Sequence, residues 1–253
     1  MTGEPEPLLE GTLISHLLEL RTRLMRAFLA VILLFIPCAY YSNQLFEWMS
    51  HPLLQQLPAH SVLISTSITA PFTAPLKLAF VVALVGAMPY VLYELWAFVA
   101  PGLYRHEQNF AVPLLVSSVI LFYVGVAFAY YLVMPLIFGF FVSTTPHGVQ
   151  LMADISVYME FVLVLLFSFG VAFEVPVVVV LLTLTGLVKV EQLRAARGYV
   201  VIGIFIVAAV LTPPDPLSQV MMAGPMWLLY ELGLIFARIL NSGSKGDDDW
   251  ESF

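Results

Sequence analysis

The sequence is poor in charged residues. Asp, Glu, Lys and Arg make up only 11% of its 253 residues, whereas hydrophobic residues make up 60%. A soluble domain carries about 25% charged residues, because these residues cover its surface. The shortage of charge therefore excludes a water-soluble globular protein and predicts a chain whose main solvent is lipid. Cysteine is nearly absent too: Cys38 stands alone, which excludes an internal disulfide and a metal site built from several cysteines.

The sequence also lacks the motifs of several enzyme classes. It contains no glycine-rich phosphate-binding loop, no H-E-x-x-H metalloprotease motif and no G-x-S-x-G nucleophile elbow. Its 10 basic residues are outnumbered by 17 acidic ones, which gives a net charge of −7, whereas a surface that binds nucleic acid is basic. We therefore expect a protein that is not an enzyme, holds no metal or cofactor and binds no nucleic acid.

Long apolar runs divide the chain into candidate membrane-spanning helices. A helix needs about 20 apolar residues to cross the bilayer core. The fifth run is too short for this, so it should thin the bilayer or lie behind other helices. Pro135 in the third run and Pro176 in the fourth are predicted to kink their helices. The six runs are residues 24–41, 78–100, 110–142, 155–184, 199–211 and 217–240.

Basic residues predict how the chain is oriented. Nine of the 10 lysines and arginines lie in segments on the same side of the membrane as the termini, and Lys77 alone lies on the other side. By the positive-inside rule, both termini are expected in the cytoplasm. We therefore expect a cytoplasmic amphipathic segment (residues 1–23), a six-span membrane domain (24–240) and an acidic, disordered cytoplasmic tail (241–253).

The segment before the first span has two faces. Leucines recur from residue 13 to residue 24 at helical spacing and form an apolar stripe, while His16, Glu19, Arg23 and Arg26 form a polar one. Glu19 and Arg23 are placed to form an i,i+4 ion pair. Periodicity alone predicts an amphipathic helix that lies at the cytoplasmic interface and exposes its polar face to solvent.

Four acidic residues lie within the spans. A carboxylate is costly when it faces lipid, so each should face protein, water or a partner. Glu94 and Glu231 lie near the cytoplasmic ends, where reaching the headgroups is an alternative. Glu174 lies deeper, beside Pro176, and we expect it to be functional. Glu160, Glu174 and Glu231 could instead form the relay of a proton-coupled secondary transporter, and a purely structural scaffold is a third possibility.

Six motifs resemble the signatures of the TatC family, the receptor subunit of the twin-arginine (Sec-independent) protein translocase. They occur in order and with matching spacing between about residue 12 and about residue 240. The motifs are HLLELR (16–21), WAFVAP (96–101), LYRHE (103–107), VPLL (112–115), FGVAFEVP (169–176) and TPPD (212–215).

The resemblance implies both a fold and a function. It implies an all-α integral membrane protein with six spans, both termini in the cytoplasm, a short fifth span and a cupped, concave arrangement of helices. Such a protein sits in the bacterial cytoplasmic (inner) membrane and binds the twin-arginine signal peptides of folded precursor proteins. It assembles with TatA and TatB into oligomers of TatBC units, and the protonmotive force drives export.

The resemblance also implies site residues. Glu19 and Glu107 are the carboxylates that would bind the two arginines of the signal peptide, since a guanidinium can bind a carboxylate through two parallel hydrogen bonds. Pro52 and Pro176 match structural positions, whereas Glu94 and Glu160 replace residues that are polar but uncharged in better-known members. The other residues implied to bind the signal peptide are His16, Arg21, Phe98, Tyr104 and Arg105. The residues implied to contact the apolar part of the peptide, or TatA and TatB, are Glu174, Thr212, Asp215 and Gln219.

Overall fold

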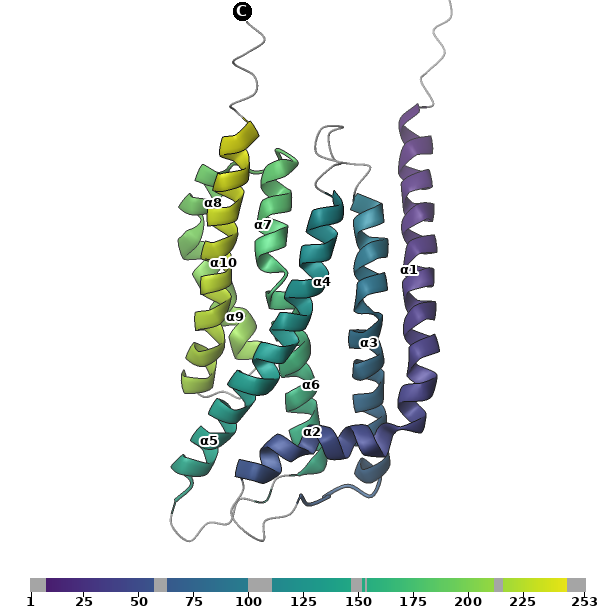
Figure 1. Ribbon diagram of the computed structural model, residues 1–253, viewed down its shortest axis with the longest axis vertical. Helices are drawn as coiled ribbons and strands as arrows, with labels where there is room; N and C mark the ends of the chain where they lie inside the picture. The colour runs from purple at the N-terminus through teal and green to yellow at the C-terminus, as the bar shows by residue number, and fades with distance from the viewer. Residues whose placement is uncertain are drawn as a thin grey trace, which may run out of the picture.

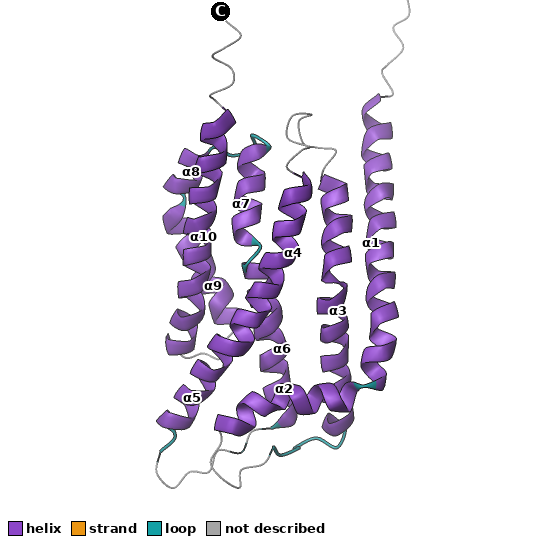
Figure 2. Cartoon of the chain, in the orientation of Figure 1, coloured by secondary structure: helices purple, strands orange, loops and turns teal. Residues whose placement is uncertain are grey.

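The computed structural model describes residues 8–56, 63–99, 111–146, 152, 154–211 and 216–244. Within these ranges the chain is almost wholly helical, and Ile64 and Asp154 form an isolated β-bridge (Figure 2). The elements are α1 (Leu8–Tyr40), α2 (Ser42–Gln56), α3 (Ala70–Val99), α4 (Ala111–Phe128), the π-helix η3 (Ala129–Val133), α5 (Met134–Thr144), α6 (Ile155–Ala172), α7 (Val175–Leu184), α8 (Val190–Ala195), α9 (Arg197–Leu211) and α10 (Pro216–Ser244).

The helices form an upright bundle in which α1 begins and α10 ends at the same end (Figure 1). We call this the terminal end, and the opposite end, where α2 lies across the bundle, the α2 end. In the described part of the chain, five helical segments are long and apolar enough to cross a membrane, and α9 is a shorter apolar helix. The 15 residues of α9 span about 22 Å, less than the core of about 30 Å. The expected multi-pass helical membrane protein with a short fifth span is confirmed.

Both predicted proline irregularities are present. The third apolar run is divided into α4, η3 and α5, and Pro135 lies in the first turn of α5, directly after the π-helix. The fourth run is divided at Phe173 and Glu174, and Pro176 lies in the first turn of α7. Proline lacks the amide hydrogen of a regular helical hydrogen bond, and each of these two irregularities lies beside its proline, whereas α3 continues through Pro75 and Pro89.

Two glycines allow α4 and α6 to cross closely. A Cβ atom at Gly125 would lie 2.5 Å from the carbonyl oxygen of Phe169, and one at Gly170 would lie 2.6 Å from the Phe122 ring. Phe122 and Phe169 are themselves completely buried at this crossing. Small residues are the usual means by which membrane helices approach each other, because lipid supplies no hydrophobic driving force between them.

The first two helices show contacts that the sequence did not predict. Residues 8–40 form one continuous helix, and part of the polar face of its first half contacts α3 through His16 and Arg23. Residues 42–56, for which no element was predicted, form α2, which packs on the bundle through a stacked Trp48–Tyr130 pair and a hydrogen bond from Tyr158 to the Met49 carbonyl. Pro52 lies within α2.

Candidate functional site

The polar face of α1 meets α3 at the terminal end. The two helices run antiparallel, so the beginning of α1 lies beside the end of α3 (Figure 1). The His16 ring stacks on the Phe98 ring with centroids 4.2 Å apart, and Arg23 contacts Glu94 one turn further into the bundle. Deeper still, Phe35 meets Phe80 edge-on. The stripe that periodicity predicted as solvent-exposed is therefore partly an interface between helices.

Arg23 binds two carboxylates at this interface. Its Nε and Nη2 donate to Oε1 of Glu19 at 3.0 and 2.6 Å, and its Nη1 donates to Oε2 of Glu94 at 3.2 Å. The hydroxyl of Tyr90 donates to the other oxygen of Glu94 at 2.8 Å. We call Glu19, Arg23, Glu94 and Tyr90 the Arg23 network. With two carboxylates and one guanidinium, its formal charge is −1.

Exposure changes across the Arg23 network. The Glu94 side chain is 5% exposed, that of Arg23 is 21% exposed and that of Glu19 is 41% exposed. A groove of about 310 Å³ lies beside Glu19, lined by Leu18, Glu19, Thr22, Arg23 and Arg26. The network therefore presents the carboxylate of Glu19 to an open groove, where Arg23 and Arg26 also line the wall, and keeps the carboxylate of Glu94 inside the protein.

A second polar site lies in the middle of the bundle. Glu174 occupies the break between α6 and α7, and its Oε1 atom is buried without a hydrogen-bond partner among the described residues. Its side chain interacts with Ser118 of α4, whose hydroxyl oxygen accepts a hydrogen bond from the Trp96 indole of α3 at 3.3 Å. A buried carboxylate oxygen without a partner is costly in a membrane protein, so it marks a place where a further polar group would bind favourably.

Comparison with known proteins identifies the family. The family model of the Sec-independent protein translocase protein (TatC) matches residues 15–225. The chain belongs to the TatC family. It is 50% identical over 253 residues to the TatC protein of Azotobacter chroococcum mcd 1, covering 100% of this chain and 99% of the relative. It is also 50% identical to the TatC protein of Escherichia coli K12 over 226 residues, which cover 89% and 88% of the two chains.

A solved structure supports the same assignment. A crystal structure described as the twin arginine translocase receptor TatC aligns with a TM-score of 0.81 and 35% identity, covering 88% of this chain and 98% of that one. The protein is thus a multi-pass membrane component of the Sec-independent protein translocase. TatC is a transport family without enzymatic activity, which confirms the expectation that this chain is not an enzyme.

Several residues that the TatC motifs single out are placed by the structure. His16, Glu19 and Phe98 come together at the terminal end, whereas Arg21 is exposed on another face of α1. Gln219 of α10 donates a hydrogen bond to the Phe205 carbonyl of α9 at 3.1 Å. Tyr104, Arg105, Glu107, Thr212 and Asp215 lie outside the described residues.

The burial of Glu94 between α1 and α3 was not predicted from the sequence. Its position near the helix end allowed a side chain that reaches the lipid headgroups, but the structure buries it against Arg23 and Tyr90. The i,i+4 spacing of Tyr90, Glu94 and Phe98 was the available signal, since it places all three on one face of α3. Arg23, four residues after Glu19, had been assigned only to a local pair.

The acids proposed for a transporter relay have separate surroundings. Glu231 pairs with Arg197 at the terminal end, with 2.5 Å between oxygen and nitrogen. Glu160 is exposed in a groove of about 610 Å³ that Lys77 also lines, and Glu174 interacts with Ser118. Among the described residues, no hydrogen bond links these acids to one another, and no three metal-ligating side chains lie close enough to hold an ion.

Proposed function

We propose that this TatC protein is the receptor of a twin-arginine translocase in the bacterial cytoplasmic membrane. In this proposal it binds the twin-arginine signal peptides of folded precursor proteins at the terminal end and assembles with TatA and TatB for export driven by the protonmotive force. The observation that carries the proposal is the carboxylate of Glu19, which is 41% exposed and borders an open groove at the terminal end.

The chemistry of the groove suits arginine better than lysine. A guanidinium is planar and presents several N–H donors in a fixed fork, whereas an ammonium is a compact point charge. Arg23 itself shows how Glu19 binds such a fork, because two of its N–H groups converge on one oxygen. A hydrogen bond to a charged group contributes about 1.5–3 kcal/mol. Glu19 and Glu107 together would therefore contribute most of the discrimination between arginine and lysine in the signal peptide.

The charge distribution supports a cytoplasmic terminal end. Arg21, Arg23 and Arg26 lie near the start of α1, and Arg197 and Arg238 lie near the corresponding ends of α9 and α10. Of the lysines and arginines that the structure describes, only Lys77 lies towards the α2 end. We infer that signal peptides, which arrive from the cytoplasm, meet the terminal end first.

Glu174 and the segment around Gln219 are proposed as contacts for membrane-embedded partners. The apolar part of a signal peptide, or the single spans of TatA and TatB, would bring a polar group to the unpaired Oε1 of Glu174. Thr212, Asp215 and Gln219 would contact TatA or TatB between α9 and α10, within oligomers of TatBC units. Pro52 and Pro176 retain the structural roles that the resemblance implies.

Site-specific photocrosslinking tests the receptor proposal. Glu19→Gln and Glu107→Ala should each abolish or strongly reduce crosslinking of a twin-arginine precursor to the terminal end, while the protein still inserts in the membrane at normal levels. Glu160→Gln is the matched control, because it removes an exposed acid in a different groove. Undiminished crosslinking to the Glu19→Gln and Glu107→Ala variants would remove both residues from the site and overturn the proposal.

A further inference from the structure

Arg23 occupies the place that an incoming arginine would take. Both of its short hydrogen bonds to Glu19 end on the same oxygen, Oε1. A carboxylate oxygen has two lone pairs, so Arg23 uses the full acceptor capacity of Oε1. A guanidinium that binds Glu19 through two parallel hydrogen bonds needs both oxygens, and it must therefore displace Arg23 from one of them.

Glu94 provides a second place for Arg23. It already accepts one hydrogen bond from Nη1, at 3.2 Å, and the Tyr90 hydroxyl holds its other oxygen. Its side chain is 5% exposed, so it is fixed within the interface between α1 and α3 and is not itself open to a ligand. A buried carboxylate is strongly destabilising without a partner, and this favours keeping Arg23 on Glu94 whatever happens at Glu19.

We propose that Arg23 is a built-in competitor for Glu19, and that Glu94, held by Tyr90, retains Arg23 when a guanidinium-bearing segment binds. Glu94 is then a positioning residue: it touches no ligand but determines whether Glu19 is available. This inference rests on the proposed function, because the segment it concerns is the twin-arginine signal peptide.

Net charge leads to the same conclusion. Without Glu94, the pair of Glu19 and Arg23 would be neutral and would attract a cationic peptide only weakly. With Glu94 the network has a charge of −1, and it keeps that charge when Arg23 moves from Glu19 towards Glu94. Arg26, which lines the same groove, adds a positive charge and brings the sum of the four charged side chains to zero; without Glu94 the sum would be +1, which would repel a cationic peptide.

A double-mutant cycle tests the inference. The full chain in nanodiscs would be titrated with a fluorescent twin-arginine signal peptide, and the dissociation constant measured for wild type, Glu94→Gln, Arg23→Gln and the double variant. Glu94→Gln should weaken binding about tenfold or more, because Arg23 then has only Glu19 to bind. Arg23→Gln combined with Glu94→Gln should restore wild-type affinity or better, since Glu19 is then free and no buried charge lacks a partner.

The double variant decides the question. If it binds as weakly as Glu94→Gln alone, Arg23 does not compete for Glu19 and the inference is wrong. Glu231→Gln, which removes an acid paired with a different arginine at the same end, is the control and should leave affinity unchanged. Failure of the receptor proposal gives a different pattern: Glu19→Gln would then bind the peptide as well as wild type, and a twin-lysine peptide would bind equally.

Discussion

The crossing of α4 and α6 at Gly125 makes a quantitative prediction about stability. In Gly125→Ala the new methyl group would lie 2.5 Å from the Phe169 carbonyl oxygen and 2.9 Å from the Phe173 Cβ atom. Neither atom belongs to the far end of a flexible side chain, so the helices must separate. Overpacking of this kind costs about 1–3 kcal/mol. Separation would also displace Ser118, which lies on the same face of α4, from Glu174.

Gly203→Ala is the matched control for this change. Gly203 lies in α9, and no neighbouring atom lies within 4 Å of the Cβ position. Alanine there should stabilise the helix by up to about 1 kcal/mol, because alanine has the higher helix propensity. In detergent, the melting temperature of Gly203→Ala should therefore be equal to or above that of wild type. The melting temperature of Gly125→Ala should be several degrees lower, since each kcal/mol of lost stability lowers it by roughly 2–4 °C. Equal melting temperatures for the two variants would refute the close crossing.

Three further predictions concern other parts of the bundle. Hydrogen bonds led by those from the Thr66 hydroxyl and amide lower the pKa of Asp154 to about 2, so the stabilisation they provide is complete above about pH 4 and is lost as the pH falls towards 2. The melting temperatures of Thr66→Val and wild type should therefore converge as the pH is lowered over that range. A difference that widens would contradict this. Glu174→Leu should reduce export of a twin-arginine reporter while signal-peptide crosslinking at the terminal end persists; normal export would exclude a role for this carboxylate. Gln219→Leu should weaken co-purification of TatB at an unchanged protein level, whereas a parallel fall in both would indicate a folding defect.

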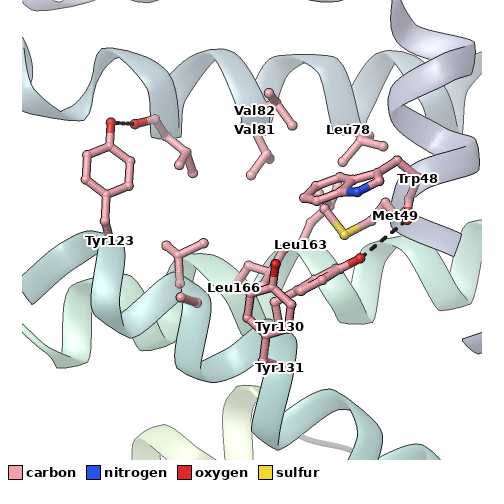
Figure 3. A pocket seen from close by; sticks show the side chains of 13 residues that line it. Trp48, Met49, Leu78, Val81, Val82, Tyr123, Tyr130, Tyr131, Leu163 and Leu166 are labelled. Atoms are coloured by element: carbon pink, nitrogen blue, oxygen red, sulfur yellow. Dashed lines mark hydrogen bonds between the residues drawn. The ribbon is translucent and has the colours of Figure 1, made fainter. Parts of the chain in front are cut away.

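Much of the fold could be predicted because its causes are local. Apolar runs define the spans, and Pro135 and Pro176 determine where the third and fourth runs are interrupted. The helix α2 was missed because its stability comes from packing on the bundle through Trp48 and Tyr130, and no periodicity in a short segment of mixed polarity reveals such contacts. Figure 3 shows how these aromatic side chains line an apolar pocket between α2, α3 and the π-helix.

The site could be predicted only in part, for a related reason. Glu19, His16 and Phe98 carry motif signals, and the structure brings them together at one end. The pairing of Arg23 with Glu94 joins residues that are 71 positions apart, and a contact at that separation depends on how α1 and α3 align. Its position near the end of a span made Glu94 a candidate for the headgroup region; its burial follows from the antiparallel pairing of these two helices.

The most direct test compares one signal peptide with its twin-lysine counterpart. Both peptides would be titrated against the wild-type protein in nanodiscs and against Glu19→Gln, with dissociation constants measured at a fixed salt concentration. The account predicts that wild type binds the twin-arginine peptide at least about tenfold more tightly than the twin-lysine peptide, and that Glu19→Gln loses most of this preference. Equal affinity of the wild-type protein for the two peptides would contradict it.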